Sequence, residues 1–204
     1  MIQSNLNPAL WERYEVYPSF VLGFHGCDRA IGEAVLNGEI PHLNPSRNDY
    51  DWLGEGIYFW ESNPARALDF ARERARGGRN SRGEISEPFV VGAILDLGHC
   101  FSTTEMTALM RLKEAYETLS ENYIRDNIPL PSNGPTLKTR RLDCAAFNLM
   151  HTLADLEGRA PYDTIRAAFS EGGELFPGSG FRQADHTQIC VRNLDCVLGY
   201  FRPL

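Results

Sequence analysis

Hydrophobic and polar residues alternate along the chain in blocks that predict a mixed α+β domain. Apolar runs of strand length occur at residues 20–25, 56–60, 89–97, 162–169, 187–191 and 196–201. Segments of helical periodicity separate several of these runs. The pattern contains no internal repeat, and 204 residues suit one domain. We therefore expect a single domain of short strands with segregated helices.

Four helices are predicted from apolar positions three and four residues apart. The first follows Asp28 and ends near Gly38, and the second begins at Pro64 with Asn63 as its N-cap. The other two run through residues 109–123 and 142–156, and they predict a helical hairpin inserted at 101–158. Ser102 to Glu105 has the pattern of a capping box for that hairpin, and His151 is expected on a surface or half-buried position. Residues 1–19 are expected to form a short helix leading into a loop.

The stretch from Asp51 to Pro64 combines a glycine-rich turn, an aromatic strand and a helix start. Alternation along a strand places Tyr58 and Trp60 on one face and Phe59 on the other. Such a concentration of rings predicts a core or a ligand pocket lined with aromatic side chains.

Charge narrows the classes of function. The net charge is −7 and the sequence pI is near 5.3, which argues against a large non-specific phosphate-binding surface. Two basic runs, at residues 72–82 and 138–141, are candidates for a local basic groove, and we interpret both as solvated helix faces or ends.

The five cysteines match no zinc-binding spacing, so we expect buried, reduced thiols and no metal. Neither a secretory leader nor a membrane span is apparent, which predicts a cytoplasmic protein. Cys27 follows His25 by two residues, but a nucleophilic pair would lack a third orienting group.

Polar residues at strand ends carry the candidate chemistry. His25 and Gly26 end the first strand, Tyr58 follows a glycine turn, and Gln188 begins a strand after a long glycine-rich loop. Polar groups from separate strands commonly meet to form a nucleotide pocket.

Two of these blocks resemble a known family. Phe24-His25-Gly26, and Gly54-Glu55-Gly56-Ile57-Tyr58-Phe59 followed by a helix, resemble the signature blocks of diphtheria-toxin-type, poly(ADP-ribose)-polymerase-like ADP-ribosyltransferases. The resemblance is close over residues 20–76 and looser over 160–204, and segment 101–158 has no counterpart in it. It implies a split antiparallel sheet with a cleft that binds NAD in a bent form.

The resemblance also implies roles for single residues. His25 would bind a ribose hydroxyl, the backbone of Gly26 would bind the nicotinamide carboxamide, and Tyr58 would stack on the nicotinamide ring. Gly56 belongs to the same cofactor-binding block, and Arg47 lies in the loop that would cover the diphosphate of NAD.

The chain departs from the family at Gln188, where a glutamate is usual. A carboxylate stabilises the positive charge that develops on the ribose, whereas a neutral amide can only orient it. This favours mono-transfer over polymer synthesis. Glu171 or Glu174 could supply the carboxylate from the loop, and His186 would lie on the face where related enzymes select the acceptor and could take its proton.

Three hypotheses stay open. The first is a mono-ADP-ribosyltransferase acting on a macromolecule, weakly favoured to be a protein rather than a nucleic acid, with NAD hydrolysis as its nearest variant. The second is a non-catalytic module that binds NAD or ADP-ribose. The third is a partner-binding protein that uses the 101–158 insertion as its contact surface. An intracellular toxin or phage-defence effector would be a fitting setting for the first.

Overall fold

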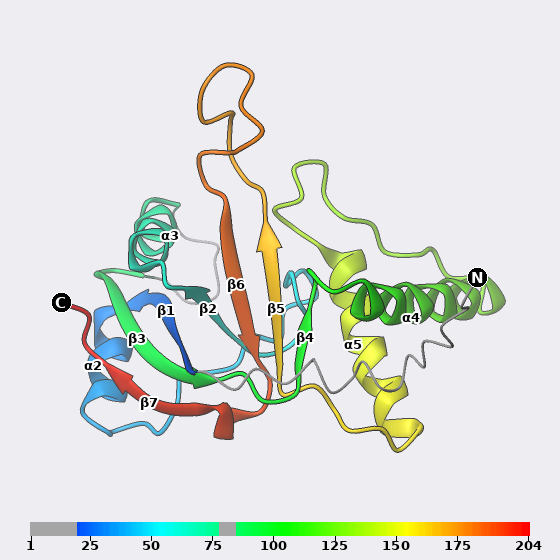
Figure 1. Ribbon diagram of the computed structural model, residues 1–204, viewed down its shortest axis with the longest axis horizontal. Helices are drawn as coiled ribbons and strands as arrows, with labels where there is room; N and C mark the ends of the chain where they lie inside the picture. The colour runs from blue at the N-terminus through cyan, green and yellow to red at the C-terminus, as the bar shows by residue number, and fades with distance from the viewer. Residues whose placement is uncertain (1–19, 78–84) are drawn as a thin grey trace, which may run out of the picture.

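The computed structural model describes residues 20–77 and 85–204, an α+β fold in which a seven-stranded mixed sheet carries four α-helices (Figure 1). Predictions for residues 1–19, Arg79 and Arg82 lie outside this part. The strands are β1 (Phe20–Asp28), β2 (Ile57–Glu61), β3 (Pro88–Asp96), β4 (Cys100–Ser102), β5 (Thr164–Phe169), β6 (His186–Val191) and β7 (Val197–Phe201). The helices are α2 (Arg29–Leu36), α3 (Pro64–Arg76), α4 (Met106–Arg125) and α5 (Arg141–Leu156).

The sheet divides naturally into two halves at its centre. Its strand order is β4-β5-β6-β2-β1-β3-β7. Nine residue pairs join β1 to β3 and four join β2 to β6, but only Gly23–Glu61 and Phe24–Trp60 join β1 to β2. Beyond Phe24 the two central strands diverge, and this opening is called the fork below. The sheet is not wholly antiparallel as expected, because β4 runs parallel to β5.

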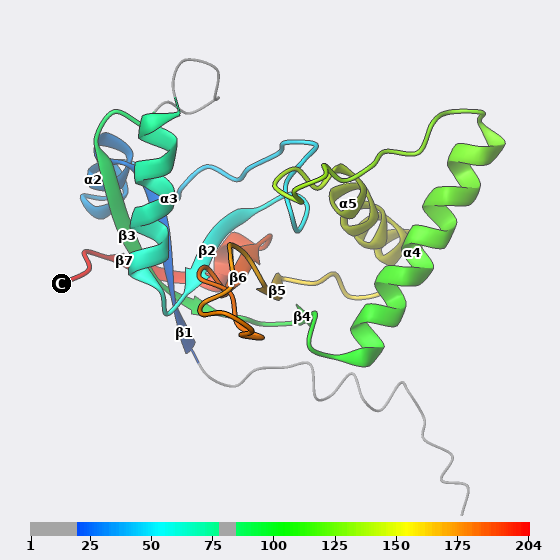
Figure 2. The same cartoon turned by 90° about the horizontal axis from the view of Figure 1, so that it is seen from above.

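Helices cover the two halves unequally. On one face, α3 packs over β1 and β3, while α4 and α5 pack over the β4–β5–β6 half (Figure 2). On the opposite face, α2 covers β1 and β3, where Gly32 approaches the rings and methyls of Phe89 and Val91. The face between α3 and α5 consists of β2 and β6, and we call it the central face.

Three apolar clusters follow from this arrangement. The largest, around Phe59, Leu95 and Ile189, fills the α2 side of the sheet. A second, around Phe101, Phe147 and Ile165, lies under α4 and α5, and a third joins Phe24 and Trp60 to α3. Tyr58 and Trp60 thus lie on one face and Phe59 on the other, as the alternation predicts.

Helix starts confirm two of the three predicted caps. Asp28 Oδ1 accepts from the backbone N–H of Ala30 at 3.0 Å, and Asn63 Oδ1 accepts from that of Arg66 at 3.0 Å. The capping-box prediction is wrong. Ser102 is buried in β4, and α4 begins at Met106 without a side-chain cap. Ser102 forms a strand instead of a helix cap because residues 100–102 pair with β5, a distant segment that the local sequence cannot show.

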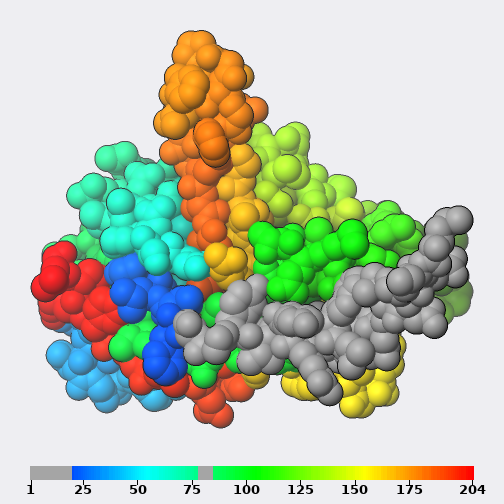
Figure 3. Space-filling model, in the orientation of Figure 1, coloured from blue at the N-terminus to red at the C-terminus, as the bar shows by residue number. Residues whose placement is uncertain are grey.

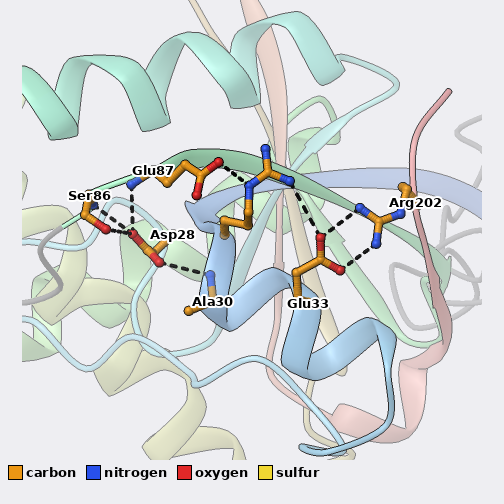
Figure 4. A network of polar contacts seen from close by, with 7 residues as sticks. Asp28, Ala30, Glu33, Ser86, Glu87 and Arg202 are labelled. Atoms are coloured by element: carbon orange, nitrogen blue, oxygen red, sulfur yellow. Dashed lines mark hydrogen bonds and ion pairs between the residues drawn. The ribbon is translucent and has the colours of Figure 1, made fainter.

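Hydrogen bonds and ion pairs connect both ends of α2 to the sheet (Figure 4). Asp28 Oδ2 accepts from the backbone N–H groups of Ser86 and Glu87 at 2.7 and 3.0 Å, and these bonds hold the pKa of its carboxyl well below the usual range. Within α2, Glu33 forms a bidentate salt bridge with Arg202, which follows β7. These contacts join the start of β3 and the end of β7 to the same short helix.

Residues 170–185 project beyond the rest of the domain as a long connection between β5 and β6 (Figure 3). Its tip exposes Leu175, Phe176 and Phe181 to 55%, 58% and 69%. Its base returns to the sheet, because Ser170 donates to Asp185 at 2.7 Å. The connection therefore extends past the ends of β5 and β6 (Figure 1), with a hydrogen-bonded base and an apolar tip.

His151 corrects another expectation. It is 4% exposed inside α5, where it meets the edge of the Tyr162 ring, rather than lying at a surface position. Burial lowers the pKa of His151 to about 3. In the segments 20–77 and 85–204, we find no helix long and apolar enough to cross a bilayer.

Candidate functional site

Three neighbouring strands bring His25, Tyr58 and Gln188 to the middle of the sheet. They lie on β1, β2 and β6, which are adjacent in the order β6-β2-β1 although they are far apart in sequence. Tyr58 pairs with Cys190 and Trp60 pairs with Gln188, so all four side chains project onto the central face. Tyr58, Trp60 and Gln188 therefore share the central face. His25 lies beside them in the sheet, but its ring meets Phe59 of the opposite face edge to face, with centroids 5.9 Å apart.

His25 lies in the fork itself. Its Nδ1 donates to the Tyr58 carbonyl oxygen at 2.7 Å, just past the last residue pair of β1 and β2. Because that carbonyl can only accept, Nδ1 carries the proton and Nε2 is left as the second hydrogen-bonding atom. Burial lowers the pKa of His25, which keeps the imidazole neutral at physiological pH.

Gly26 has a structural reason to be glycine. A Cβ built on it would lie 2.1 Å from the Ala67 carbonyl oxygen, so α3 can approach β1 only over a residue without a side chain. The approach of α3 brings Arg66 and Phe70 to the rim of the central face. Gly26 thus sets the position of one wall of the candidate site.

The Tyr58 hydroxyl closes the glycine turn that precedes its strand. It donates to the Gly54 carbonyl oxygen at 2.6 Å and accepts from the Leu53 N–H at 2.9 Å. Gly54 has a φ of +77°, and a Cβ on Gly56 would lie 2.5 Å from Cys190 Sγ. These glycines are therefore needed for the tight turn against β6, and burial raises the pKa of Tyr58.

Gln188 lies on the floor of the central face between Trp60 and Ala167. It is 9% exposed, and its side-chain amide makes no hydrogen bond to any residue that the structure describes. Trp60 is 4% exposed and its indole Nε1 also finds no partner among those residues. The Trp60 indole N–H is thus a buried, unpaired donor beside the Gln188 amide, and a buried polar group without a partner calls for an explanation.

Glu171 reaches the central face from the projecting connection. Its carboxylate lies 3.2 Å from Arg66 Nη2 and 3.6 Å from His186 Nδ1. The structure thus brings together Glu171, His186 and the Gln188 strand as candidates, and it adds Arg66, which sequence analysis overlooked. The charge of Glu171 is already balanced by Arg66, which weakens its ability to stabilise a developing cation.

His186 is sealed by rings. Its side chain is 0% exposed, and ring centroids of Phe169, Trp52 and Trp60 lie 5.6, 6.3 and 6.4 Å away. Nδ1 donates to the Ala184 carbonyl oxygen at 2.8 Å, which leaves Nε2 unpaired among the described residues. Burial lowers the pKa of His186, so the ring is neutral.

Two other candidates differ in exposure. Arg47 is a surface cation with a side chain 77% exposed and its Nε 3.8 Å from Glu55 Oε2. Glu174 accepts from the Gly178 N–H at 3.1 Å within the connection.

All five cysteines are free and buried, and burial raises the pKa of the Cys27 thiol to about 12. The raised pKa disfavours the thiolate that a Cys27 nucleophile would need.

A hollow of about 370 Å³ opens beside the central face, on the α5 side. Trp52, Arg140, Phe147 and Phe169 contribute to its walls, and none of His25, Gly26, Arg47, Gly56 and Tyr58 does. Sequence analysis assigned no ligand role to Trp52 or Arg140. Their signal was present in the aromatic stretch and in the basic run, but only the fold brings the two together.

Comparisons with known proteins add little to this picture. No protein-family model matches the chain, and no curated protein matches it. A crystal structure of an anti-CRISPR protein matches with 12% sequence identity and a TM-score of 0.36, covering 91% of this chain and 98% of that one. Similarity at this level does not show a shared fold.

Proposed function

We propose that the protein is a mono-ADP-ribosyltransferase with an ADP-ribosyltransferase-like fold, which moves ADP-ribose from NAD to a macromolecule and releases nicotinamide. One observation carries the proposal. The residues of three sequence blocks, His25, Tyr58 and Gln188, lie on three adjacent central strands where the sheet divides. The buried and unpaired Trp60 Nε1 and His186 Nε2 beside these strands support a polar ligand there, because packing alone does not require them.

In this proposal the donor lies across the fork. His25 Nε2 binds a ribose hydroxyl, because its Nδ1 is already committed to the Tyr58 carbonyl. The half-buried Tyr58 ring stacks on nicotinamide, and Arg47 closes over the diphosphate. The glycosidic carbon–nitrogen bond then breaks, nicotinamide leaves with the bonding electrons, and the acceptor bonds to the same carbon as it loses its proton.

Gln188 orients the ribose in place of a carboxylate. Glu171 supplies negative charge nearby, but Arg66 shares it, so the rate should be modest. Charge-assisted hydrogen bonds are about twice as strong as neutral ones, so a neutral amide slows the step without preventing it. This is consistent with transfer of single ADP-ribose groups.

Incubation with NAD labelled in the adenylate part tests the proposal. We expect free nicotinamide and label bound to a macromolecule, both lost in His25→Ala. Both should be retained in the control His42→Ala, because His42 lies outside the candidate site, beside Tyr200 of β7. Free ADP-ribose without labelled macromolecule would instead identify an NAD glycohydrolase. Absence of nicotinamide with every acceptor supplied would contradict the proposal.

A non-catalytic NAD-binding module is the second candidate, and the neutral Gln188 favours it. The variant Gln188→Glu separates the two. If the wild-type protein binds NAD without turnover and Gln188→Glu gains no activity, the binding module is the better description. If Gln188→Glu instead accelerates a turnover that the wild-type protein already shows, the transferase is the better description.

A further inference from the structure

The hollow beside the central face has walls of an unusual composition. Aromatic rings, one guanidinium and small residues of β5 surround a volume of about 370 Å³. Ala167 of this lining pairs with Gln188 across the strands, and Phe169 pairs with His186. The hollow therefore lies one strand away from the candidate reaction centre, on the side opposite His25.

The Arg140 guanidinium lies over two aromatic rings in this hollow. Its guanidinium carbon is 4.3 Å from the centroid of Trp52 and 4.9 Å from that of Phe169, and these two rings meet edge to face at 4.7 Å. A guanidinium plane and aromatic rings are the groups on which proteins stack unpaired nucleobases. The composition of the walls thus suits a flat, π-bearing ligand.

Hydrogen bonds fix these groups before any ligand arrives. Arg140 Nε donates to the Leu137 carbonyl oxygen at 3.0 Å, and Nη1 lies 3.4 Å from Asp143 Oδ2. Asn133 holds the other oxygen of Asp143 at 2.7 Å. The Trp52 indole N–H donates to the Lys138 carbonyl oxygen at 3.0 Å, so the basic run 138–141 is tied directly to the hollow.

The basic run that contains Arg140 also has two exposed cations that a sugar–phosphate strand could use. Lys138 is exposed and has no ion-pair partner among the residues described. Arg141 pairs with Asp49 at 3.0 Å, but both side chains are well exposed, at 48% and 72%, so the pair is weak and exchangeable. The positive charge of Arg140 is balanced by Asp143, so we expect Arg140 to contribute by stacking and not by its charge.

We propose that this hollow binds a nucleobase of a single-stranded nucleic acid, which is the acceptor of the ADP-ribose group. The acceptor part of the proposal rests on the proposed function, whereas base binding does not. Stacking on Trp52, Phe169 and Arg140 holds the base, Lys138 and Arg141 contact its flanking phosphates, and the neighbouring nucleotide reaches Gln188. The acidic net charge then limits binding to this local groove.

Fluorescence anisotropy with labelled single-stranded RNA and DNA oligonucleotides of mixed sequence tests base binding in the absence of NAD. We expect saturable binding that weakens as salt rises. Trp52→Ala and Arg140→Ala should weaken it about tenfold, because one stacked base contributes on that scale. Trp52→Phe keeps a ring and should stay within about threefold of wild type, which guards against loss of the fold.

Matched controls lie outside the hollow. Phe176→Ala removes an exposed ring of the projecting connection, and Arg159→Ala removes an exposed arginine beyond the end of α5; neither should change binding. Oligonucleotide binding that is absent, or equal in wild type and Trp52→Ala, would overturn the proposal.

Two further arms distinguish the source of the base. If NAD and AMP compete fully with the oligonucleotide, the hollow takes the donor's adenine, and the acceptor assignment is wrong. With labelled NAD, we expect label on the oligonucleotide that nuclease removes. Label that resists nuclease and follows only protein would overturn the acceptor assignment while supporting the transferase itself, and no nicotinamide release at all would instead overturn the proposed function.

Discussion

His25 and His186 offer a comparison between two regions of the central sheet. Each donates its Nδ1 proton to a backbone carbonyl, at 2.7 and 2.8 Å, and burial lowers the pKa of both. They differ in what surrounds the second nitrogen. His25 lies where β1 and β2 part, whereas His186 is enclosed by three aromatic rings at the base of the projecting connection.

The difference separates a binding role from a positioning role. The His25 ring packs edge to face against Phe59, but the residue is partly exposed, and its Nε2 is not among the buried unpaired atoms as that of His186 is. A sealed imidazole beside Glu171 and Arg66 instead fixes the base of the connection, and it can act on an acceptor only if that base moves. In the proposed function the fork is the donor side of the candidate site, and the hollow forms its acceptor side.

The largest effect that tests this contrast is on turnover. His25→Ala should reduce nicotinamide release at least about 100-fold, because loss of a positioning contact can cost that much. His186→Ala should reduce transfer to the acceptor while nicotinamide release stays within several-fold. Steady-state nicotinamide assays beside label-transfer assays separate the two. Equal loss of both activities in the two variants would break the contrast.

A second prediction extends the comparison to the third buried histidine, His151. Its pKa is about 3 when folded, against 6.5 for the free side chain. Below pH 6.5 the His151 side chain is protonated in the unfolded chain but stays neutral in the native state. The free energy of unfolding therefore decreases as the pH is lowered, by up to about 1.4 kcal/mol per pH unit. Above pH 6.5 this contribution is complete and constant.

Urea unfolding between pH 7 and pH 5 measures this slope. His151→Leu should flatten it relative to wild type, since leucine removes the titration and the unpaired Nε2. An identical slope in His151→Leu would show that other groups control the acid sensitivity.

The smallest effect concerns the Arg66–Glu171 pair, with side chains 16% and 19% exposed. A double-mutant cycle on stability should give a coupling of about 1–2 kcal/mol, because partial burial reduces screening. The more exposed Arg202–Glu33 pair, at 55% and 31%, is the matched control and should give less than about 1 kcal/mol. Equal couplings would mean that the 170–185 connection is not held by this contact.

Local sequence predicted most elements, for physical reasons that particular residues show. Asn63-Pro64 and Asp28 specify helix starts by chemistry that acts within a few residues, and alternation placed Tyr58 and Phe59 on opposite faces. The capping-box prediction at Ser102 failed because pairing of β4 with β5 outweighed the local capping pattern. His151 misled because its burial depends on Tyr162, a contact that periodicity does not reveal.

The candidate site was predictable only in part. Sequence placed His25, Tyr58 and Gln188 at strand ends. That expectation is wrong for His25, because β1 continues to Asp28 and His25 lies within it, where its pairing with β2 has ended. Arg66 looked like one more arginine of a polar helix, and only the packing of α3 over Gly26 brings it to Glu171. Trp52 and Arg140 are 88 residues apart in numbering and meet solely through the loop before β2 and the start of α5.

The central claim is that NAD binds in the fork between β1 and β2, and a thermal-shift titration with NAD tests it most directly. A ligand at a hundredfold excess over its dissociation constant stabilises the native state by about 2.7 kcal/mol. We predict a clear rise in melting temperature for wild type and for His42→Ala, and its loss in a folded His25→Ala. A wild-type protein that NAD does not stabilise, or a shift that survives in His25→Ala, would contradict the account.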